Sequence, residues 1–251
     1  MTWQRAVHYE KTWGTIITFD VRDPVLPEKD LFAARDEAVR FLHLVRDIFS
    51  TFEPTSLISL VRSGVLQEQD VSSVEYHEVA QNCLAYKKLT HGYFDPWLSD
   101  GGVDFSGYVK GWAAQRASDI FSQYGFFNTA VNAAGDVYCG GFQSENVPWQ
   151  VGIQHPNDKE NIMGVMSASN RAVCTSGIYL KGNHIVQAFS PTLDVPSILS
   201  ATVSGPDGGG ADALATALVV AGATGRAWFS PLPTWSVILV TSNNEVLKWE
   251  V

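Results

Sequence analysis

The sequence contains few cysteines, and their spacing suggests no pairing. Its 251 residues include three, Cys83, Cys139 and Cys174, which are widely separated and form no CxxC pair. Isolated cysteines of this kind are typical of reduced, buried thiols rather than of a disulfide framework. The sequence also has no HExxH motif and no Cys/His cluster, which argues against a structural zinc site. We therefore expect reduced thiols and a cytoplasmic location.

Long apolar runs and an excess of basic charge are also missing. No stretch approaches eighteen consecutive apolar residues, and the N-terminus lacks an apolar core of signal-peptide length, so we expect no membrane span. Seventeen basic and twenty-six acidic side chains give a net charge of −9. This balance disfavours a nucleic-acid partner, because binding a phosphate backbone needs a basic surface. A nucleotide ligand is still compatible with this net charge, since one cation or helix N-terminus can neutralise a diphosphate.

The composition is that of a globular protein, with 45% hydrophobic and 17% charged residues. We find no internal repeat, low-complexity tract or linker, so we predict a single domain over residues 1–251. Strand-like and helix-like segments are interleaved irregularly along the chain. This pattern favours an α+β (mixed α/β) fold of two packed βα halves over a doubly wound parallel sheet.

Apolar periodicity predicts the elements of this fold. Ser72 and Glu75 form a capping-box pattern before the second expected helix, and Gly125 fits the position just after the third. The expected helices cover residues 28–49, 72–90 and 107–124 and a segment beginning near 211. The expected strands cover residues 12–21, 128–134, 136–141, 148–154, 171–176, 184–189 and 198–205, with a closing hairpin of 235–242 and 245–251.

The segment GGVDFSGYVKG, residues 101–111, is the densest in groups that could bind a ligand. It combines the carboxylate of Asp104, the hydroxyl of Ser106, several glycines and Lys110 at the start of an expected helix. Glycines at such a turn allow a ligand to approach the backbone, and a lysine can contact a phosphate. The segment is not a P-loop, and a glycine-rich turn with a capping aspartate explains it equally well.

A second candidate is ADALATALVVAG, residues 211–222. Asp212 and Thr216 are four residues apart, so on a helix they share one face, with Ala215 beside them. Their oxygens could bind a hard cation such as Mg²⁺. The alternative is an aspartate stabilised by the helix dipole and a threonine bonded to its own backbone.

Hydroxyl groups and one histidine complete the candidates. Thr175 and Ser176 end an expected strand in AVCTSG, where they could hold a nucleotide phosphate or form an ordinary turn. His184, in GNHIVQ, is the histidine best placed to act as a general base, although a lone histidine in a strand is often structural.

Taken in order, these segments resemble the ApbE family of FAD:protein FMN transferases. The matching pieces are WGTIITF, FSTFEPTSLISLV, HGYFDP, VDFSGYVKGWAAQ, TAVNAAGDVYCGG, WQVGIQHP, AVCTSGIY, NHIV and ADALATALVVAG. They cover most of the chain, and DFSGYVKG and ADALATA are the most specific of them. The resemblance implies a single compact ApbE-like domain.

The resemblance also implies roles for individual residues. His184 would be the catalytic base. Mg²⁺ would be bound by the Gly107 carbonyl, Asp212 and Thr216, with Ala215 beside them. The implied FAD contacts are Trp13, Phe52, Tyr93, Phe94, Asp95, Asp104, Lys110, Thr175 and Val186.

The activity implied by the resemblance is Mg²⁺-dependent transfer of FMN from FAD to a threonine of a target flavoprotein, with release of AMP. Two alternatives remain open at this point. One is an FAD pyrophosphatase that releases FMN and AMP, and the other is a protein that binds FAD without turnover. A Rossmann-type redox enzyme has little support, because no GxGxxG follows an expected strand.

Overall fold

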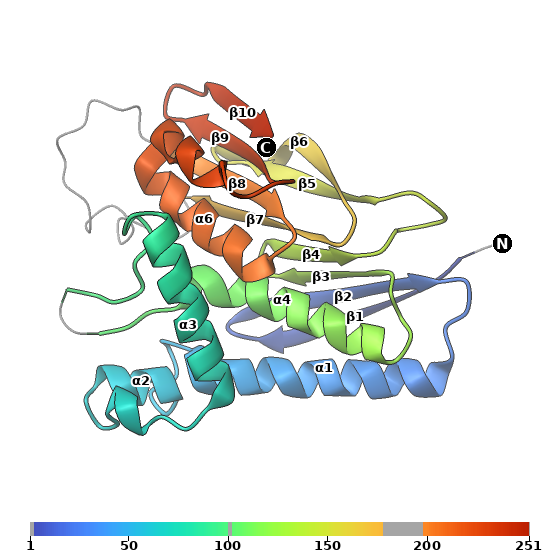
Figure 1. The fold of residues 1–251 in the computed structure, drawn as a ribbon. Helices are drawn as coiled ribbons and strands as arrows, with labels where there is room; N and C mark the ends of the chain where they lie inside the picture. The colour runs from blue at the N-terminus through green and yellow to red at the C-terminus, as the bar shows by residue number, and fades with distance from the viewer. Residues whose placement is uncertain (1–2, 100–101, 178–197, 251) are drawn as a thin grey trace.

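The computed structural model describes residues 3–99, 102–177 and 198–250. An eight-stranded sheet in the order β1-β2-β3-β4-β7-β8-β9-β10 carries helices on one face, and a two-stranded sheet, β5-β6, lies against its other face (Figure 1). Each pair of neighbouring strands is antiparallel. The mixed α+β fold expected from the sequence is thus confirmed.

The strands are β1 (Gln4–Thr12), β2 (Thr15–Asp23), β3 (Thr129–Ala133), β4 (Asp136–Gly140), β5 (Trp149–His155), β6 (Asp158–Ala168), β7 (Arg171–Gly177), β8 (Ile198–Gly205), β9 (Ser236–Thr241) and β10 (Val246–Glu250). The helices are α1 (Glu28–Phe49), α2 (Leu57–Arg62), α3 (Val74–Leu89), α4 (Ser106–Gln123) and α6 (Gly208–Ala221), with 3₁₀ turns at Glu68–Asp70 and Gly222–Phe229. Among the helices described, none is long and apolar enough to cross a membrane.

The first two strands form a hairpin that the sequence pattern did not resolve. Residues 12–21 were expected to be one strand, but Trp13 and Gly14 have φ angles of 55° and 69°. Two consecutive positive φ angles are what a tight two-residue hairpin turn requires. The expected strand was therefore wrong at its start, because the chain reverses there and β1 pairs with β2.

Strand β2 alternates between the two faces of the large sheet. Ile17, Phe19 and Val21 are buried in the core that the helices cover. The residues between them, including Thr18 and Asp20, therefore lie on the opposite face.

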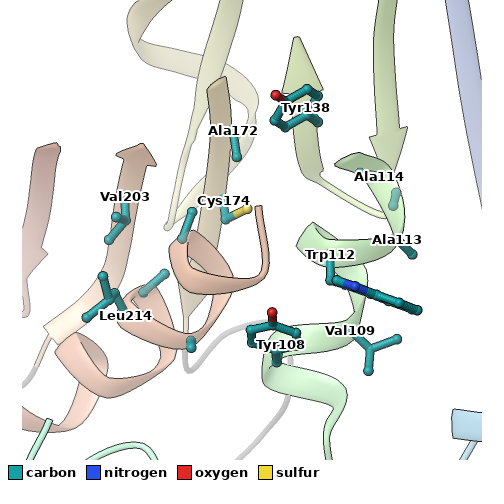
Figure 2. Packing of buried hydrophobic residues seen from close by; sticks show 14 of the residues in the cluster. Tyr108, Val109, Trp112, Ala113, Ala114, Tyr138, Ala172, Cys174, Val203 and Leu214 are labelled. Carbon is teal, nitrogen blue, oxygen red and sulfur yellow. The ribbon is translucent and has the colours of Figure 1, made fainter. Parts of the chain in front are cut away.

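Helices α4 and α6 pack at unusually short distance through glycines. A Cβ atom placed on Gly111 would lie 2.0 Å from the Gly208 carbonyl oxygen, and one on Gly209 would lie 2.2 Å from the Tyr108 ring. No side chain can occupy such positions, so the two backbones touch directly. Figure 2 shows this region, with Tyr108 and Trp112 on α4 and Leu214 on α6. The close approach places Lys110 of α4 beside the N-terminal half of α6.

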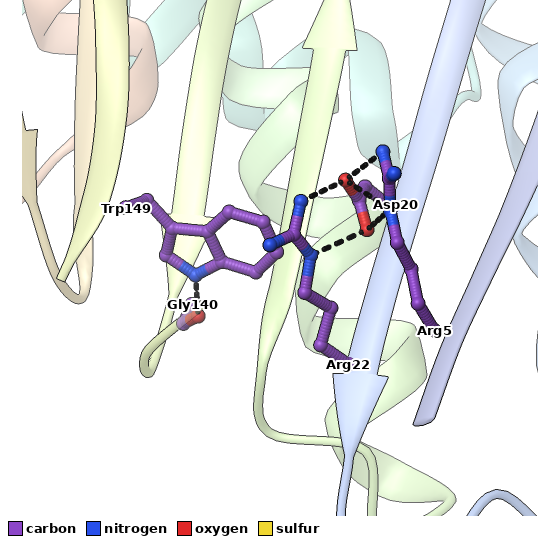
Figure 3. A network of polar contacts seen from close by, with 5 residues as sticks. All are labelled: Arg5, Asp20, Arg22, Gly140 and Trp149. Carbon is purple, nitrogen blue, oxygen red and sulfur yellow. Dashed lines mark hydrogen bonds and ion pairs between the residues drawn. The ribbon is translucent and has the colours of Figure 1, made fainter. Parts of the chain in front are cut away.

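The β5–β6 hairpin covers part of the other sheet face. Trp149 and Ala168 pack with Cys139 of β4 and Val173 of β7 in a small separate core. The Trp149 indole also donates a hydrogen bond to the Gly140 carbonyl over 2.9 Å (Figure 3). Strand β6 was not expected, because its sequence, DKENIMGVMSA, is mixed in polarity and lacks a clear alternation.

Other boundaries agree closely with the sequence pattern. Helix α1 covers the expected residues, and Gly125 follows α4 with a φ of 87°, as a residue after a helix end commonly does. Helix α3 is capped by Ser73 rather than Ser72, since the Ser73 hydroxyl accepts the amide of Tyr76. Helix α6 begins at Gly208, three residues before its expected start. The strand expected at 184–189 lies outside the described residues.

Candidate functional site

The antiparallel registers bring two hairpin turns and the end of a third strand to one end of the large sheet. Ile17 pairs with Ala133, and Val137 pairs with Val173. The β1–β2 turn, the β3–β4 turn and the end of β7 therefore share that end. Figure 1 shows that α4 also begins there. Several of the residues singled out in the sequence come from these segments and from α6.

Lys110 is at the centre of this region. Its ammonium forms a very close ion pair with Asp136 Oδ2, and it lies 3.5 Å from Asp212 Oδ2. The Lys110 side chain is 21% exposed, whereas both carboxylate side chains are 1% exposed. Two buried carboxylates facing one ammonium leave a local excess of negative charge, which is costly in a poorly solvated place.

Asp136 is a functional candidate that the sequence reasoning did not name. It is the first residue of β4 and follows the Ala134–Gly135 turn. Its Oδ2 accepts from Lys110, and its Oδ1 accepts from the Thr175 amide over 3.0 Å. One carboxylate thus ties α4 to β7. The only sequence signal was its place in the matching piece TAVNAAGDVYCGG.

Asp212 is fully buried, and its two oxygens accept no hydrogen bond from any residue that the structure describes. An ionised carboxylate in this state is unfavourable without a counter-charge. The Lys110 ammonium compensates only partly, because it is bound more closely by Asp136. With no hydrogen bond from the described residues, the Asp212 oxygens could bind a cation, and carboxylate oxygens are ligands that hard metal ions prefer.

Thr216 lies one turn after Asp212 on α6. Its Oγ1 is 3.0 Å from the Ser176 hydroxyl at the end of β7, and a Cβ atom placed on Gly107 would lie 3.0 Å from that same Oγ1. The α4 backbone at Gly107 therefore lies directly beside the threonine. Ala215, also buried, precedes Thr216 on the same helix. The expected metal residues are thus brought to one place on two helices.

The expected metal-binding residues offer few side-chain ligands. Within the described part of the chain, no group of three or more His, Cys, Asp or Glu side chains could hold a metal ion. A cation here would depend on one carboxylate, one hydroxyl and backbone oxygen. Magnesium often binds through few protein ligands and retains waters or substrate phosphates, so the donor types fit it.

Two buried thiols lie close enough to Asp212 for its charge to affect them. Burial, followed by the charge of Asp212, raises the pKa of Cys83 and of Cys174. The Cys174 thiol donates to the Gly208 carbonyl over 3.7 Å. Both groups stay protonated near neutral pH, so they are neither nucleophiles nor thiolate ligands.

Aromatic residues border the start of α4. Phe94 is buried, and its ring lies 3.4 Å from the position of a Cβ atom on Gly107. Tyr93 is half-buried, with its ring centroid 5.5 Å from that of Trp228. Phe94 therefore lies next to the Gly107–Thr216 contact, and Tyr93 immediately precedes Phe94 in the chain.

The carboxylates of Asp95 and Asp104 make local contacts. Asp104 Oδ1 accepts the amide of Ser106 over 2.9 Å in a local turn, while the N-cap of α4 is Phe105, which makes no side-chain cap hydrogen bond. Asp95 accepts the Trp97 amide over 3.0 Å and forms a 2.8 Å ion pair with Lys87. A contact of either residue with a cofactor stays a prediction.

Trp13 and Phe52 lie beside α1, outside the group around Lys110. The Trp13 indole donates to the Leu42 carbonyl over 3.0 Å, and the Phe52 side chain is 93% exposed. Their roles as flavin contacts stay predictions. His184, the expected base, and Val186 lie outside the described residues.

The same fold is found in solved flavin transferases. The flavin transferase ApbE from Vibrio cholerae matches with a TM-score of 0.78 and 20% identity, covering 99% of this chain and 97% of that one. The ApbE protein from Thermotoga maritima matches with a TM-score of 0.80 and 19% identity, covering 98% and 97%. At these identities the likeness establishes the fold.

The sequence relationship is more specific. The ApbE family model matches residues 98–239, which is more than half of the chain, and this chain therefore belongs to the ApbE family. The matched range contains Gly107, Lys110, Asp136, Asp212 and Thr216.

Curated FAD:protein FMN transferases align with this chain over part of their length. The FAD:protein FMN transferase of Escherichia coli K12 is 32% identical over 164 residues, and that of Salmonella typhimurium is 29% identical over 151 residues. These alignments cover 62% and 57% of this chain and 47% and 43% of the relatives. The chain thus spans about half the length of the curated relatives it matches.

Proposed function

We propose that this chain is a Mg²⁺-dependent flavin transferase that passes the FMN half of FAD to a threonine hydroxyl of a target flavoprotein and releases AMP. Membership of the ApbE family and relatives named FAD:protein FMN transferase support this function. The observation that carries it is the buried Asp212 carboxylate, whose oxygens accept no hydrogen bond from the described residues, beside Lys110 and Thr216.

Three residues would hold the metal ion in this proposal. They are Asp212 through its carboxylate, Thr216 through its hydroxyl and Gly107 through its carbonyl, with Ala215 next to them. When bound, Mg²⁺ would neutralise charge on the diphosphate of FAD and polarise its phosphorus–oxygen bonds. A cation at Asp212 would also relieve the local excess of negative charge around Lys110.

Residues of the chain would orient the diphosphate and the nucleophile. Lys110, held by Asp136, would supply positive charge to a phosphate, and Thr175 and Ser176 lie where β7 could contribute a hydroxyl. The acceptor threonine oxygen would attack the FMN phosphorus while the bond to AMP breaks. His184 would take the proton of that hydroxyl, a role that stays a prediction.

The test uses the purified chain, FAD, Mg²⁺ and an acceptor domain that carries a threonine, with and without a chelator. Transfer adds one FMN to the mass of the acceptor, in step with AMP release, and the chelator blocks both. Release of FMN and AMP without an adduct on the acceptor would instead identify an FAD pyrophosphatase. FAD that binds and stays intact would indicate a flavin-binding protein.

A further inference from the structure

A groove of about 480 Å³ lies on the face of the large sheet opposite the helices. Its floor is the outward face of β2, β3, β4 and β7, including Thr18, Ala130 and Val173. Its wall is strand β5 of the small sheet. This groove is separate from the contact between α4 and α6.

Strand β5 presents its backbone edge to the groove. Residues 149–152, four in succession, border it. Side chains of a strand alternate between two faces, so successive residues can border one groove only along the strand edge. Among the described strands β5 pairs with β6 alone, so the edge facing the groove offers peptide groups for pairing with a further strand.

The groove continues to the candidate site. Thr175 borders its floor, and the Thr175 amide is bonded to Asp136, which holds Lys110. Gly135, in the β3–β4 turn, borders the same end. A chain lying in the groove would therefore reach the end of the sheet where Lys110 and Asp212 meet.

Exposed apolar side chains extend the surface beside the groove. Val7 pairs with Asp20 and Tyr9 pairs with Thr18, so they share the outward face, as does Ile16. These three side chains are 37%, 66% and 50% exposed. Clustered exposed apolar residues of this kind mark protein-interaction surfaces.

The charged groups of the groove are already paired, which disfavours a nucleotide there. Asp20 binds the guanidinium groups of both Arg22 and Arg5, and Arg22 also lies over the Trp149 ring, 4.7 Å from its centroid (Figure 3). Burial opposes ionisation of Asp20, but the hydrogen bonds from both arginines outweigh it and lower its pKa. A diphosphate would have to compete with this carboxylate for the guanidinium groups.

We propose that the groove receives an extended segment of the acceptor protein, which adds as a strand to the edge of β5 that pairs with no other described strand. This inference rests on the proposed function and names the surface on which its acceptor docks. Main-chain hydrogen bonds to β5 would supply affinity, as in other cases of strand addition. The segment would then present its hydroxyl at the Lys110 end of the groove.

The test fills the groove and measures each substrate separately. Thr18→Trp places a large ring on the floor, in a strand that tolerates aromatic residues. Leu84→Trp, at a 58% exposed position on α3, is the matched control. Thr18→Trp should raise the KM for the acceptor domain at least about tenfold and leave FAD affinity unchanged, whereas Leu84→Trp should change neither.

A second measurement needs no variant. Addition of the acceptor domain to the wild-type chain should slow deuterium uptake by the amides of residues 149–152. An unchanged acceptor KM in Thr18→Trp, or unchanged uptake across β5, would overturn the docking proposal. Loss of FAD affinity in Thr18→Trp would place the nucleotide in the groove and overturn it too.

The two proposals fail in different ways. Lack of FMN transfer by the wild-type chain would contradict the proposed function, and the exchange measurement would still decide whether the acceptor domain docks along β5. Transfer by the wild-type chain without protection of β5 would keep the function and reject the groove.

Discussion

The Lys110 ammonium lies 3.5 Å from Oδ2 of Asp212, a fully buried carboxylate whose oxygens accept no hydrogen bond from the described residues. The same ammonium is bound more closely by Asp136. The excess negative charge of this cluster therefore favours binding of a cation. The same charge balance determines how substitutions of Lys110 and Asp212 should behave.

Asp212→Asn should abolish the response of the protein to Mg²⁺ without destabilising the metal-free fold. Removing a buried charge that accepts no hydrogen bond from the described residues should leave the metal-free protein equally stable or more stable by about 1–3 kcal/mol. Mg²⁺ should raise the melting temperature of the wild type and have no effect on the variant. Calorimetry with and without Mg²⁺ provides both values, and an equal Mg²⁺ response in the two proteins would remove Asp212 from the metal site.

Lys110→Met should strongly destabilise the protein, since Asp136 and Asp212 would both lose their counter-charge. We expect a loss of about 3–5 kcal/mol in urea-induced unfolding. Lys87→Met is the matched control, because Lys87 pairs with Asp95 near the surface, and it should cost less than about 1 kcal/mol. If the two variants lost equal stability, the buried ion cluster would stabilise the protein no more than a surface ion pair does.

Gly111→Ala should force α4 and α6 apart, because the new methyl group would lie 2.0 Å from a backbone oxygen of Gly208. Overpacking of this kind typically costs about 1–3 kcal/mol, and a backbone contact leaves little room for adjustment. Gly164→Ala is the control, since a Cβ atom there meets nothing within 4 Å. Denaturant midpoints should fall for Gly111→Ala alone; a stable variant would show that the helices can separate freely.

The buried thiols predict a loss of stability in mild alkali. The pKa values of Cys83 and Cys174 are raised in the folded protein, so the native state keeps protons that the unfolded chain loses above about pH 8.5. The unfolded state then binds fewer protons, and stability falls as pH rises. Unfolding free energies between pH 8 and 9.5 should decline in the wild type and decline less when both cysteines are alanine. Identical dependence of stability on pH in the two proteins would contradict the raised pKa values of Cys83 and Cys174.

Much of the secondary structure could be predicted from the sequence alone, because it depends on local patterns. The apolar spacing of residues 28–49 defines α1, and Gly125 ends α4 with a positive φ that other residues adopt at a cost. The short motifs identified the ApbE family, composition indicated a globular protein, and the interleaved strand and helix patterns indicated a mixed fold. A cytoplasmic location and the base role of His184 remain predictions.

Only the tertiary structure decided how distant residues combine. Lys110, Asp136 and Asp212 are separated by 26 and 76 residues, and no local pattern indicates that one ammonium faces both carboxylates. The antiparallel registers and the glycine contact between α4 and α6 bring them together. The edge of β5 that meets no other described strand arises in the same way, because strand pairing is a property of the whole sheet rather than of any segment.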